Sequence, residues 1–205
     1  MATKRPRPPV KRMTPVERRA SILDAATEVF ASEGYQRARM VDVAERLGVT
    51  EPVVFQNFGS KAALYEAVLE LAADRFCAGL ADRLDDVGSV PELLADVVSP
   101  GHVDRLHRGA NPGVLFADAV GLRAEPAVEV AARRSIRRVA RALAQVIERG
   151  QQEGDLSTDV DSATAAWWLL SFFASHEFRR AVMPNRESLE PELARLTLGA
   201  LTGPA

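Results

Sequence analysis

The chain has 205 residues, of which 47% are hydrophobic and 26% are charged, the composition of a globular protein with a sizeable core. Residues 1–61 hold 11 Lys/Arg against 7 Asp/Glu, and residues 62–205 hold 15 against 21, so a basic module is expected to precede an acidic body. The single cysteine, Cys77, excludes an intrachain disulfide and a cage of thiolate metal ligands.

Neither secretion nor membrane insertion is expected from the sequence. Residues 1–11 are basic and proline-rich with no apolar stretch behind them, unlike a secretory signal. The most apolar run, residues 165–174, has half the length of a membrane span and is expected to be a buried helix. The expected compartment is the cytoplasm, and no cofactor, metal or membrane partner is expected.

The N-terminal segment is expected to pass from disorder to a capped helix. Residues 1–13 contain prolines and cations and almost nothing to bury, which predicts a disordered basic arm. Thr14-Pro15-Val16-Glu17 matches a capping box with proline at the first helical position. Apolar residues at helical spacing follow, and Gly34 is expected to close this helix in the left-handed conformation.

Two short helices are expected next, over residues 40–47 and from Thr50 to Phe58. Gly48 accepts the positive φ of the turn between them, and Ala44 is small enough for the two helices to touch. Thr50 is expected to cap the second helix. This spacing predicts a helix-turn-helix whose second helix fits the major groove of DNA, with an ordinary helical hairpin as the alternative.

The rest of the chain is also predicted to be helical, because it lacks the alternating pattern of strands. A long helix is expected from Lys61 to about Leu84, capped by Ser60. Further helices are expected over residues 90–98, 102–109, 113–121, 125–152, 160–182 and 188–201. The predicted fold is all-α, with an N-terminal three-helix helix-turn-helix DNA-binding domain (residues 14–60) and a larger helical ligand-binding and dimerisation domain (residues 61–205).

The segment from Thr14 to Leu69, about a quarter of the chain, resembles the TetR family of bacterial transcriptional regulators. The resemblance implies a homodimer with two DNA-reading heads and a divergent, ligand-sensing body. It rests on motifs in the family's order: Ile22-Leu23-Asp24-Ala25-Ala26, Phe30-Ala31-Ser32-Glu33-Gly34-Tyr35, Val43-Ala44, Gly48-Val49-Thr50, Val54-Phe55-Gln56-Asn57-Phe58 and Ser60-Lys61.

The resemblance implies contacts to DNA phosphates around a recognition helix at Glu51–Phe58. Thr50 stands where a hydroxyl reaches a phosphate, and Lys61 stands where a lysine does, at a helix N-terminus that favours anions. Phe55 replaces the family's usual tyrosine, so ring packing is expected there without the hydroxyl's hydrogen bond. Arg39 replaces the usual Ser/Thr before the second helix and is expected to offer a further phosphate contact.

Base reading is expected from the recognition helix. Gln56 can pair with an adenine edge, Val53 can contact a thymine methyl, and Asn57 completes the candidate set. Glu51 can accept from cytosine, with a solvated charge that tunes the register as the alternative. The arm offers candidates for minor-groove contact, with a solubilising tail as the alternative: Lys4, Arg5 and Arg7.

The last two predicted helices carry the candidate dimer interface. The segment from Asp161 to Phe178, in the helix expected over residues 160–182, is apolar almost all round and is expected to bury both sides. The last helix carries a leucine stripe. Two such helices per subunit make a four-helix interface, whereas a monomer's core helix is the alternative. The predicted interface residues are Trp167, Leu170, Ala174, Phe178, Leu189, Leu193, Leu196 and Ala200.

Aromatic residues of the body indicate a small-molecule pocket. Three of them share one helix edge at a spacing of four residues, and an aromatic wall with few polar groups suits a largely apolar ligand. A plain hydrophobic core gives the same pattern and is the alternative. The candidate lining residues are Phe76, Leu80, His107, Leu115, Phe116, Trp168, Phe172 and His176.

The predicted function is sequence-specific transcriptional regulation by a homodimer on a palindromic DNA operator. An enzyme is not expected, because the sequence contains no Walker loop, Gly-x-Ser-x-Gly or His-Glu-x-x-His motif. Repression that is relieved by an unknown, largely apolar effector is the favoured mode. A ligand-independent dimeric DNA-binding protein is the alternative.

Overall fold

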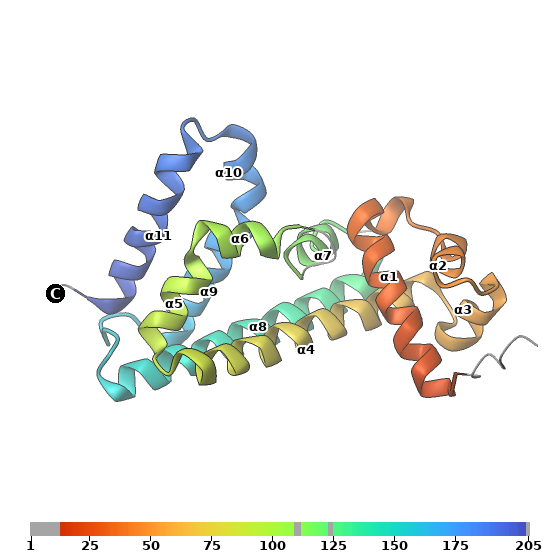
Figure 1. Ribbon diagram of the computed structural model, residues 1–205, viewed down its shortest axis with the longest axis horizontal. Coiled ribbons are helices and arrows are strands. Elements are labelled where there is room, and N and C mark those ends of the chain that lie inside the picture. Colours follow the sequence, from red (N-terminus) through yellow and green to blue (C-terminus); the bar gives the residue numbers. More distant parts are fainter. Residues whose placement is uncertain (1–12, 109–111, 123–124, 204–205) are drawn as a thin grey trace, which may run out of the picture.

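A computed structural model describes residues 13–108, 112–122 and 125–203 of the chain. Figure 1 shows an elongated molecule with α1–α3 at one end, α11 at the other, and α4 and α8 between them. The predicted all-α fold with an N-terminal helix-turn-helix is confirmed. Within the described ranges the elements are α1 (Pro15–Arg37), α2 (Met40–Leu47), α3 (Glu51–Phe58), α4 (Lys61–Val87), α5 (Val90–Val98), α6 (Pro100–Leu106), α7 (Pro112–Ala119), α8 (Pro126–Glu153), α9 (Ser162–Ala174), α10 (His176–Val182) and α11 (Arg186–Thr202).

The head, formed by α1, α2 and α3, begins and turns at the predicted residues. The Thr14 hydroxyl accepts from the Glu17 backbone N–H (3.2 Å), and the Glu17 carboxylate accepts from the Thr14 N–H (2.7 Å), which makes the capping box. Gly34 and Gly48 both have a φ of 72°, so α1 leaves the helical conformation at Gly34 and α2 ends at Gly48. Thr50 differs from the prediction, because its hydroxyl accepts no capping hydrogen bond within the described part of the chain.

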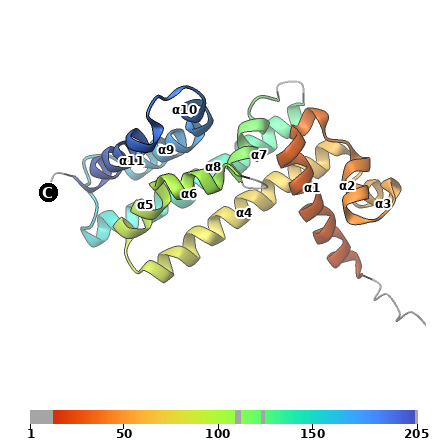
Figure 2. The same cartoon turned by 45° about the horizontal axis from the view of Figure 1, so that its top comes forward.

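Two hydrophobic cores lie along the molecule. The first core joins α1–α4, α7 and the start of α8, around residues such as Ile22 and Val54. The second core joins α4–α6, α8, α9 and α11, around Leu93 and Leu169. The helices α4 and α8 run side by side through both cores in the two ribbon views (Figures 1 and 2). Phe116 of α7 packs against both cores, so α7 lies where head and body meet.

The prediction of one helix over residues 160–182 is wrong, because this segment forms two helices. α9 ends at Ala174 and α10 begins at His176, with Ser175 between them. The Arg179 guanidinium donates to the Phe172 carbonyl (2.7 Å) and to the Ser175 hydroxyl (2.6 Å). It therefore supplies a donor to the Phe172 backbone carbonyl at the end of α9.

The other helix boundaries lie close to the predicted ones. α4 continues to Val87 and stops at Gly88, which has a φ of 76°. α6 begins at Pro100 instead of residue 102, because the Ser99 hydroxyl caps it by accepting from the His102 N–H (3.3 Å). None of the helices in the described ranges combines the length and the apolar composition that a membrane crossing requires.

Candidate functional site

The helix α3 lies at the outer end of the head and leaves one face uncovered (Figures 1 and 2). Val54 and Phe58 are buried in the head core. Glu51, Phe55 and Gln56, on the other side, are exposed. A short helix that is anchored by its inner residues and free on its outer face has the geometry of a recognition helix.

Val53 and Asn57 lie half-buried at the border of this exposed face. The Asn57 amide donates to the Val53 carbonyl (2.7 Å), so it is turned toward its own helix. Arg19 of α1 donates to the Asn57 carbonyl (2.6 Å), and its guanidinium lies 4.0 Å from the centroid of the Phe58 ring. Arg19 thus holds the end of α3, a role that local sequence patterns did not reveal because Arg19 belongs to another helix.

Thr50 and Arg39 are exposed at the starts of α3 and α2. The Arg39 guanidinium donates to the Asp42 carboxylate (2.6 Å), and this hydrogen bond holds the pKa of Asp42 below its usual value. The same carboxylate accepts from the Arg39 backbone N–H (2.9 Å), which is the bond that the third helical residue makes in a capping box. The predicted arm contacts Lys4, Arg5 and Arg7 lie outside the described residues.

Lys61, the first residue of α4, is half-buried between α1 and α4. Its ammonium donates to the Gln36 carbonyl (3.3 Å) and lies 4.5 Å from the centroid of the Tyr35 ring. Burial lowers the pKa of Lys61. A contact between Lys61 and a DNA phosphate therefore requires the side chain to leave these partners.

Two cavities of about 270 Å³ each lie in the body. The first is bounded by α4, α5 and α6 and by Thr27 of α1, and its lining includes the charged side chains of Arg75 and Arg83. The second is bounded by α7, α8 and α9. Its polar side chains are His107, Ser171 and the indole of Trp167, and the rest of its lining is apolar. The second cavity therefore suits an uncharged, largely apolar molecule.

The predicted pocket residues do not meet in a single cavity. Phe76 and Leu80 line the first cavity, whereas His107 and Phe116 line the second. Helical spacing predicted which residues share a face of one helix, but packing decides which neighbouring helix each face meets.

The other four predicted pocket residues line neither cavity. Leu115 is fully buried in the head core, because α7 turns this side toward α1 and α4. Trp168 is about half exposed on the outer side of α9. Phe172 lies under the Arg179 guanidinium, 4.4 Å from the ring centroid, and His176 is buried at the start of α10.

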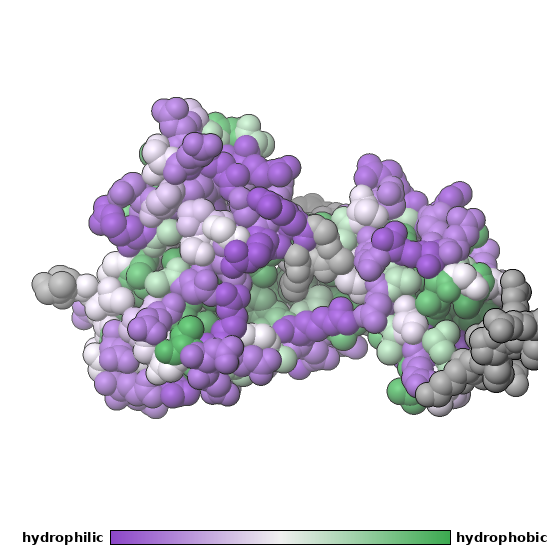
Figure 3. All heavy atoms as spheres, viewed as in Figure 1, coloured by the Kyte–Doolittle hydropathy of each residue, from purple (hydrophilic) through white to green (hydrophobic). Residues whose placement is uncertain are grey.

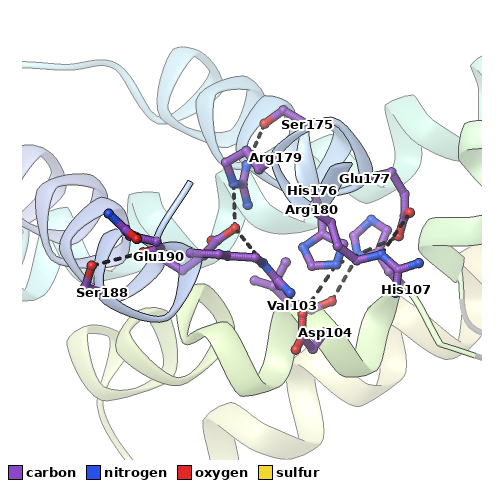
Figure 4. A network of polar contacts seen from close by, with 12 residues as sticks. Val103, Asp104, His107, Ser175, His176, Glu177, Arg179, Arg180, Ser188 and Glu190 are labelled. Atoms are coloured by element: carbon purple, nitrogen blue, oxygen red, sulfur yellow. Dashed lines mark hydrogen bonds and ion pairs between the residues drawn. The ribbon is translucent and has the colours of Figure 1, made fainter. Parts of the chain in front are cut away.

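His176 belongs to a polar network between α6, α10 and α11 (Figure 4). Its ring lies 4.4 Å from the ring of His107, and its Nε2 lies 3.4 Å from Asp104 Oδ1. Burial lowers the pKa of His176. In the same network the buried Arg179 pairs with the buried Glu190 of α11 (3.1 Å). Across the described residues, no cluster of three or more His, Cys, Asp or Glu side chains could hold a metal ion.

An apolar face extends over the outer side of α9, α10 and α11. Trp167 and Trp168 of α9 are each about half exposed within the single chain. Hydrophobic atoms also reach the surface over α10 (Figure 3). Of the predicted interface residues, Leu170 and Leu193 are half-buried, and the exposed ones are Trp167, Ala174, Phe178, Leu189, Leu196 and Ala200. Three of the eight, Trp167, Leu170 and Ala174, also line the second cavity.

An exposed recognition helix on a compact helical head, followed by a separate helical body, defines a helix-turn-helix DNA-binding protein. The family model "Bacterial regulatory proteins, tetR family" matches residues 22–68. The HTH-type transcriptional activator FasR of Mycolicibacterium smegmatis is 46% identical over 68 residues, which are 33% of this chain and 31% of that protein. The HTH-type transcriptional regulator UidR of Escherichia coli is 26% identical over 152 residues, which are 74% of this chain and 76% of that protein.

The solved structure of a TetR-family transcriptional regulator from Agrobacterium tumefaciens matches the fold with a TM-score of 0.75 at 19% identity, covering 93% of this chain and 100% of that one. The chain belongs to the TetR family of helix-turn-helix, DNA-binding transcriptional regulators. Because this family is not enzymatic, the expectation that the chain is not an enzyme is confirmed.

Proposed function

We propose that the chain is a homodimeric transcriptional repressor that leaves a palindromic operator when a small, largely apolar effector binds the body. The observation that carries the DNA-binding part is the uncovered outer face of α3, with Phe55 and Gln56 exposed above the buried Val54 and Phe58. The basic residues of the N-terminal arm (Lys4, Arg5, Arg7, Lys11 and Arg12), which are joined to the head in sequence, favour association with a phosphate backbone.

The apolar face of α9–α11 supports the homodimer. One head spans only a few base pairs, so useful specificity requires a symmetric pair of heads on two half-sites. Exposed apolar side chains such as Trp167, Phe178 and Leu196 are of the kind that a protein–protein interface covers. A second copy that packs its own α9–α11 face here buries this surface by two-fold symmetry.

The two body cavities support effector binding. An effector can release DNA only to the extent that it binds one conformation of the body more tightly than the other. An effector of this kind is expected to raise the melting temperature of the protein and also to lower its affinity for the operator. A ligand-independent regulator shows neither effect with small apolar molecules.

Selection of bound fragments from a random duplex library, followed by affinity measurements over a range of salt, tests the proposed DNA binding. Enrichment of a two-fold symmetric site is the expected result, because a symmetric dimer reads two equal half-sites. The proposal is contradicted if no DNA sequence is enriched and the affinity for DNA does not depend on the salt concentration.

Two variants assign roles within the interface. Lys61→Ala is expected to weaken binding to all sequences and to lower the salt slope by about one unit, whereas Arg149→Ala, at the far end of α8, leaves the slope unchanged. Gln56→Ala is expected to relax the preference at one base position. An unchanged salt slope excludes Lys61 from the phosphate contacts, and an equal loss on every sequence excludes base reading by Gln56.

A further inference from the structure

One carboxylate of the body connects α7 to the head and to α4. Asp118 lies on α7, and its Oδ2 accepts from the backbone N–H of Tyr35 (2.8 Å) and from the hydroxyl of Tyr65 (2.8 Å). Burial and the neighbouring Asp118 carboxylate raise the pKa of Tyr65, so its hydroxyl stays protonated and donates. Tyr65 belongs to α4, whereas Tyr35 belongs to the last turn of α1.

The hydrogen bond between Asp118 and Tyr35 lies where the backbone of the head changes direction. Tyr35 follows Gly34, which has left the helical conformation, and a Cβ built on Gly34 would lie 3.1 Å from Asp118 Oδ1. The chain then continues through Ala38 into α2. Asp118 therefore fixes the backbone at Tyr35, and through it the orientation of α2 and α3 relative to the body.

The other side of α7 forms one wall of the cavity between α7, α8 and α9. Gly113, Phe116 and Val120 line this cavity, whereas Leu115 and Asp118 point toward the head. A helix of two turns moves as one body, so a displacement that starts at the cavity also moves the Asp118 carboxylate.

We propose that α7 is the coupling element of this protein, with Asp118 as the positioning residue that fixes the DNA-reading head relative to the body. The proposal rests on the proposed function and specifies its regulation. An uncharged apolar molecule in the α7–α8–α9 cavity displaces α7, and a shift of about 1 Å takes both 2.8 Å hydrogen bonds out of bonding range. The head then loses the orientation that lets the dimer engage two half-sites at once.

Gly113 allows α7 to be displaced without an unidentified ligand. A Cβ at this position would lie 2.8 Å from His107 Nε2 and 2.9 Å from the backbone oxygen of Leu106. Because one of these neighbours is backbone, Gly113→Ala forces the start of α7 away from the end of α6. The matched control is Gly79→Ala in α4, where a new Cβ has no described neighbour within 4 Å.

The experiment measures affinity for the selected operator and for a duplex that carries a single half-site. Asp118→Ala and Gly113→Ala are each expected to lower operator affinity about tenfold and to leave half-site affinity within about twofold. Gly113→Ala in the Asp118→Ala background is expected to cause no further loss, because the coupling is already broken. Gly79→Ala is expected to bind both duplexes as the wild type does.

Milder variants keep the test valid if Asp118→Ala unfolds the head. Asp118→Asn keeps an acceptor and is expected to retain most of the operator affinity, whereas Tyr65→Phe removes one donor and is expected to lose part of it. Faster hydrogen exchange of the Tyr35 amide in Asp118→Ala is the expected structural signature.

Three results overturn the coupling role. They are unchanged operator affinity in Asp118→Ala, an equal loss on operator and half-site, and additive losses in the double variant. If the wild type shows no salt-dependent binding to any duplex, the proposed function fails first. If the wild type binds a symmetric operator and any of the three results is found, only the coupling role of Asp118 fails.

Discussion

Phe55 exposes 43% of its surface on the outer face of α3, at a position where the resembled family usually has a tyrosine. An aromatic ring without a hydroxyl can pack against a DNA backbone but donates nothing to it. Phe55→Tyr is expected to raise the affinity for every duplex about threefold to tenfold, because one hydrogen bond to a phosphate contributes about 1 kcal/mol. Affinity at a fixed salt concentration, on operator and non-operator DNA, measures the gain.

Phe178→Tyr is the matched control for this prediction. Phe178 is also an exposed ring, but it lies on α10 in the body, so a hydroxyl there is expected to leave DNA affinity unchanged. A gain confined to one sequence would indicate base reading by residue 55 in place of a phosphate contact.

The family resemblance placed Phe55 and Gln56 on the DNA-facing side of the recognition helix. Both are exposed in the structure, because Val54 and Phe58 occupy the inward side of this eight-residue helix. The sequence did not predict the orientation of Lys61 and Asn57. Lys61 donates to Gln36 O, which only the folded chain brings within reach, whereas Asn57 donates to Val53 O one turn earlier on the same helix.

The helices α4, α5 and α6 are joined by a polar contact around His102. This residue of α6 is 8% exposed, and its Nδ1 lies 2.8 Å from a guanidinium nitrogen of Arg83 on α4. Arg83 also pairs with Asp96 of α5. Burial, followed by the positive charges of Arg83 and Arg105, lowers the pKa of His102 to about 4. The ring is therefore neutral at neutral pH and accepts a hydrogen bond from Arg83.

The stability of these three helices is expected to depend on pH through His102. The unfolded chain binds a proton on His102 below its ordinary pKa of 6.5, whereas the folded chain binds it only near pH 4. The free energy of unfolding is therefore expected to fall by about 3 kcal/mol as the pH drops from about 6.5 to 4. Denaturant unfolding at several pH values measures this change.

His102→Gln is the comparison for the pH prediction. Glutamine can accept from Arg83 but does not titrate, so the variant is expected to show a shallower pH dependence over the same window. The buried His176, whose pKa is also lowered, contributes in the same direction and remains in the variant. An equally steep decline in His102→Gln would exclude His102 as the cause.

At the scale of elements, the apolar spacing and the capping residues predicted most helices, and the α9–α10 break was missed. The apolar run of residues 165–174 passes into the mostly polar residues 175–180 without a proline or a glycine, so Ser175 is only a weak local signal of a break. The break is stabilised by Arg179, which also pairs with Glu190 of α11, a partner 11 residues away. The local pattern does not contain this contact, so it did not predict the break.

For the whole molecule, the apolar face of α9–α11 makes a testable prediction about assembly. Leu196→Glu is expected to convert the dimer to monomers in sedimentation velocity, raising the dissociation constant at least about 100-fold, because an unpaired charge would be buried at the interface. The monomer's fold is expected to be unaffected, since Leu196 is 59% exposed in the single chain.

Val130→Glu provides the matched control, because Val130 is also 59% exposed but lies on α8, outside the proposed interface. This variant is expected to remain a dimer and to bind the operator normally. If Leu196→Glu also remains a dimer at concentrations where the wild type is one, the proposed interface is wrong.

The sequence by itself determined the helical class, the head with its turn at Gly48, and the outer face of the recognition helix. These features depend on capping residues, on one glycine with a positive φ, and on apolar spacing within about 20 neighbouring residues. Only the tertiary structure decided that the predicted pocket residues divide between two cavities. It also decided that Asp118 binds Tyr35, 83 residues earlier in the chain. A contact at that separation depends on how whole helices pack, and helical periodicity specifies the faces of a helix but not its neighbours.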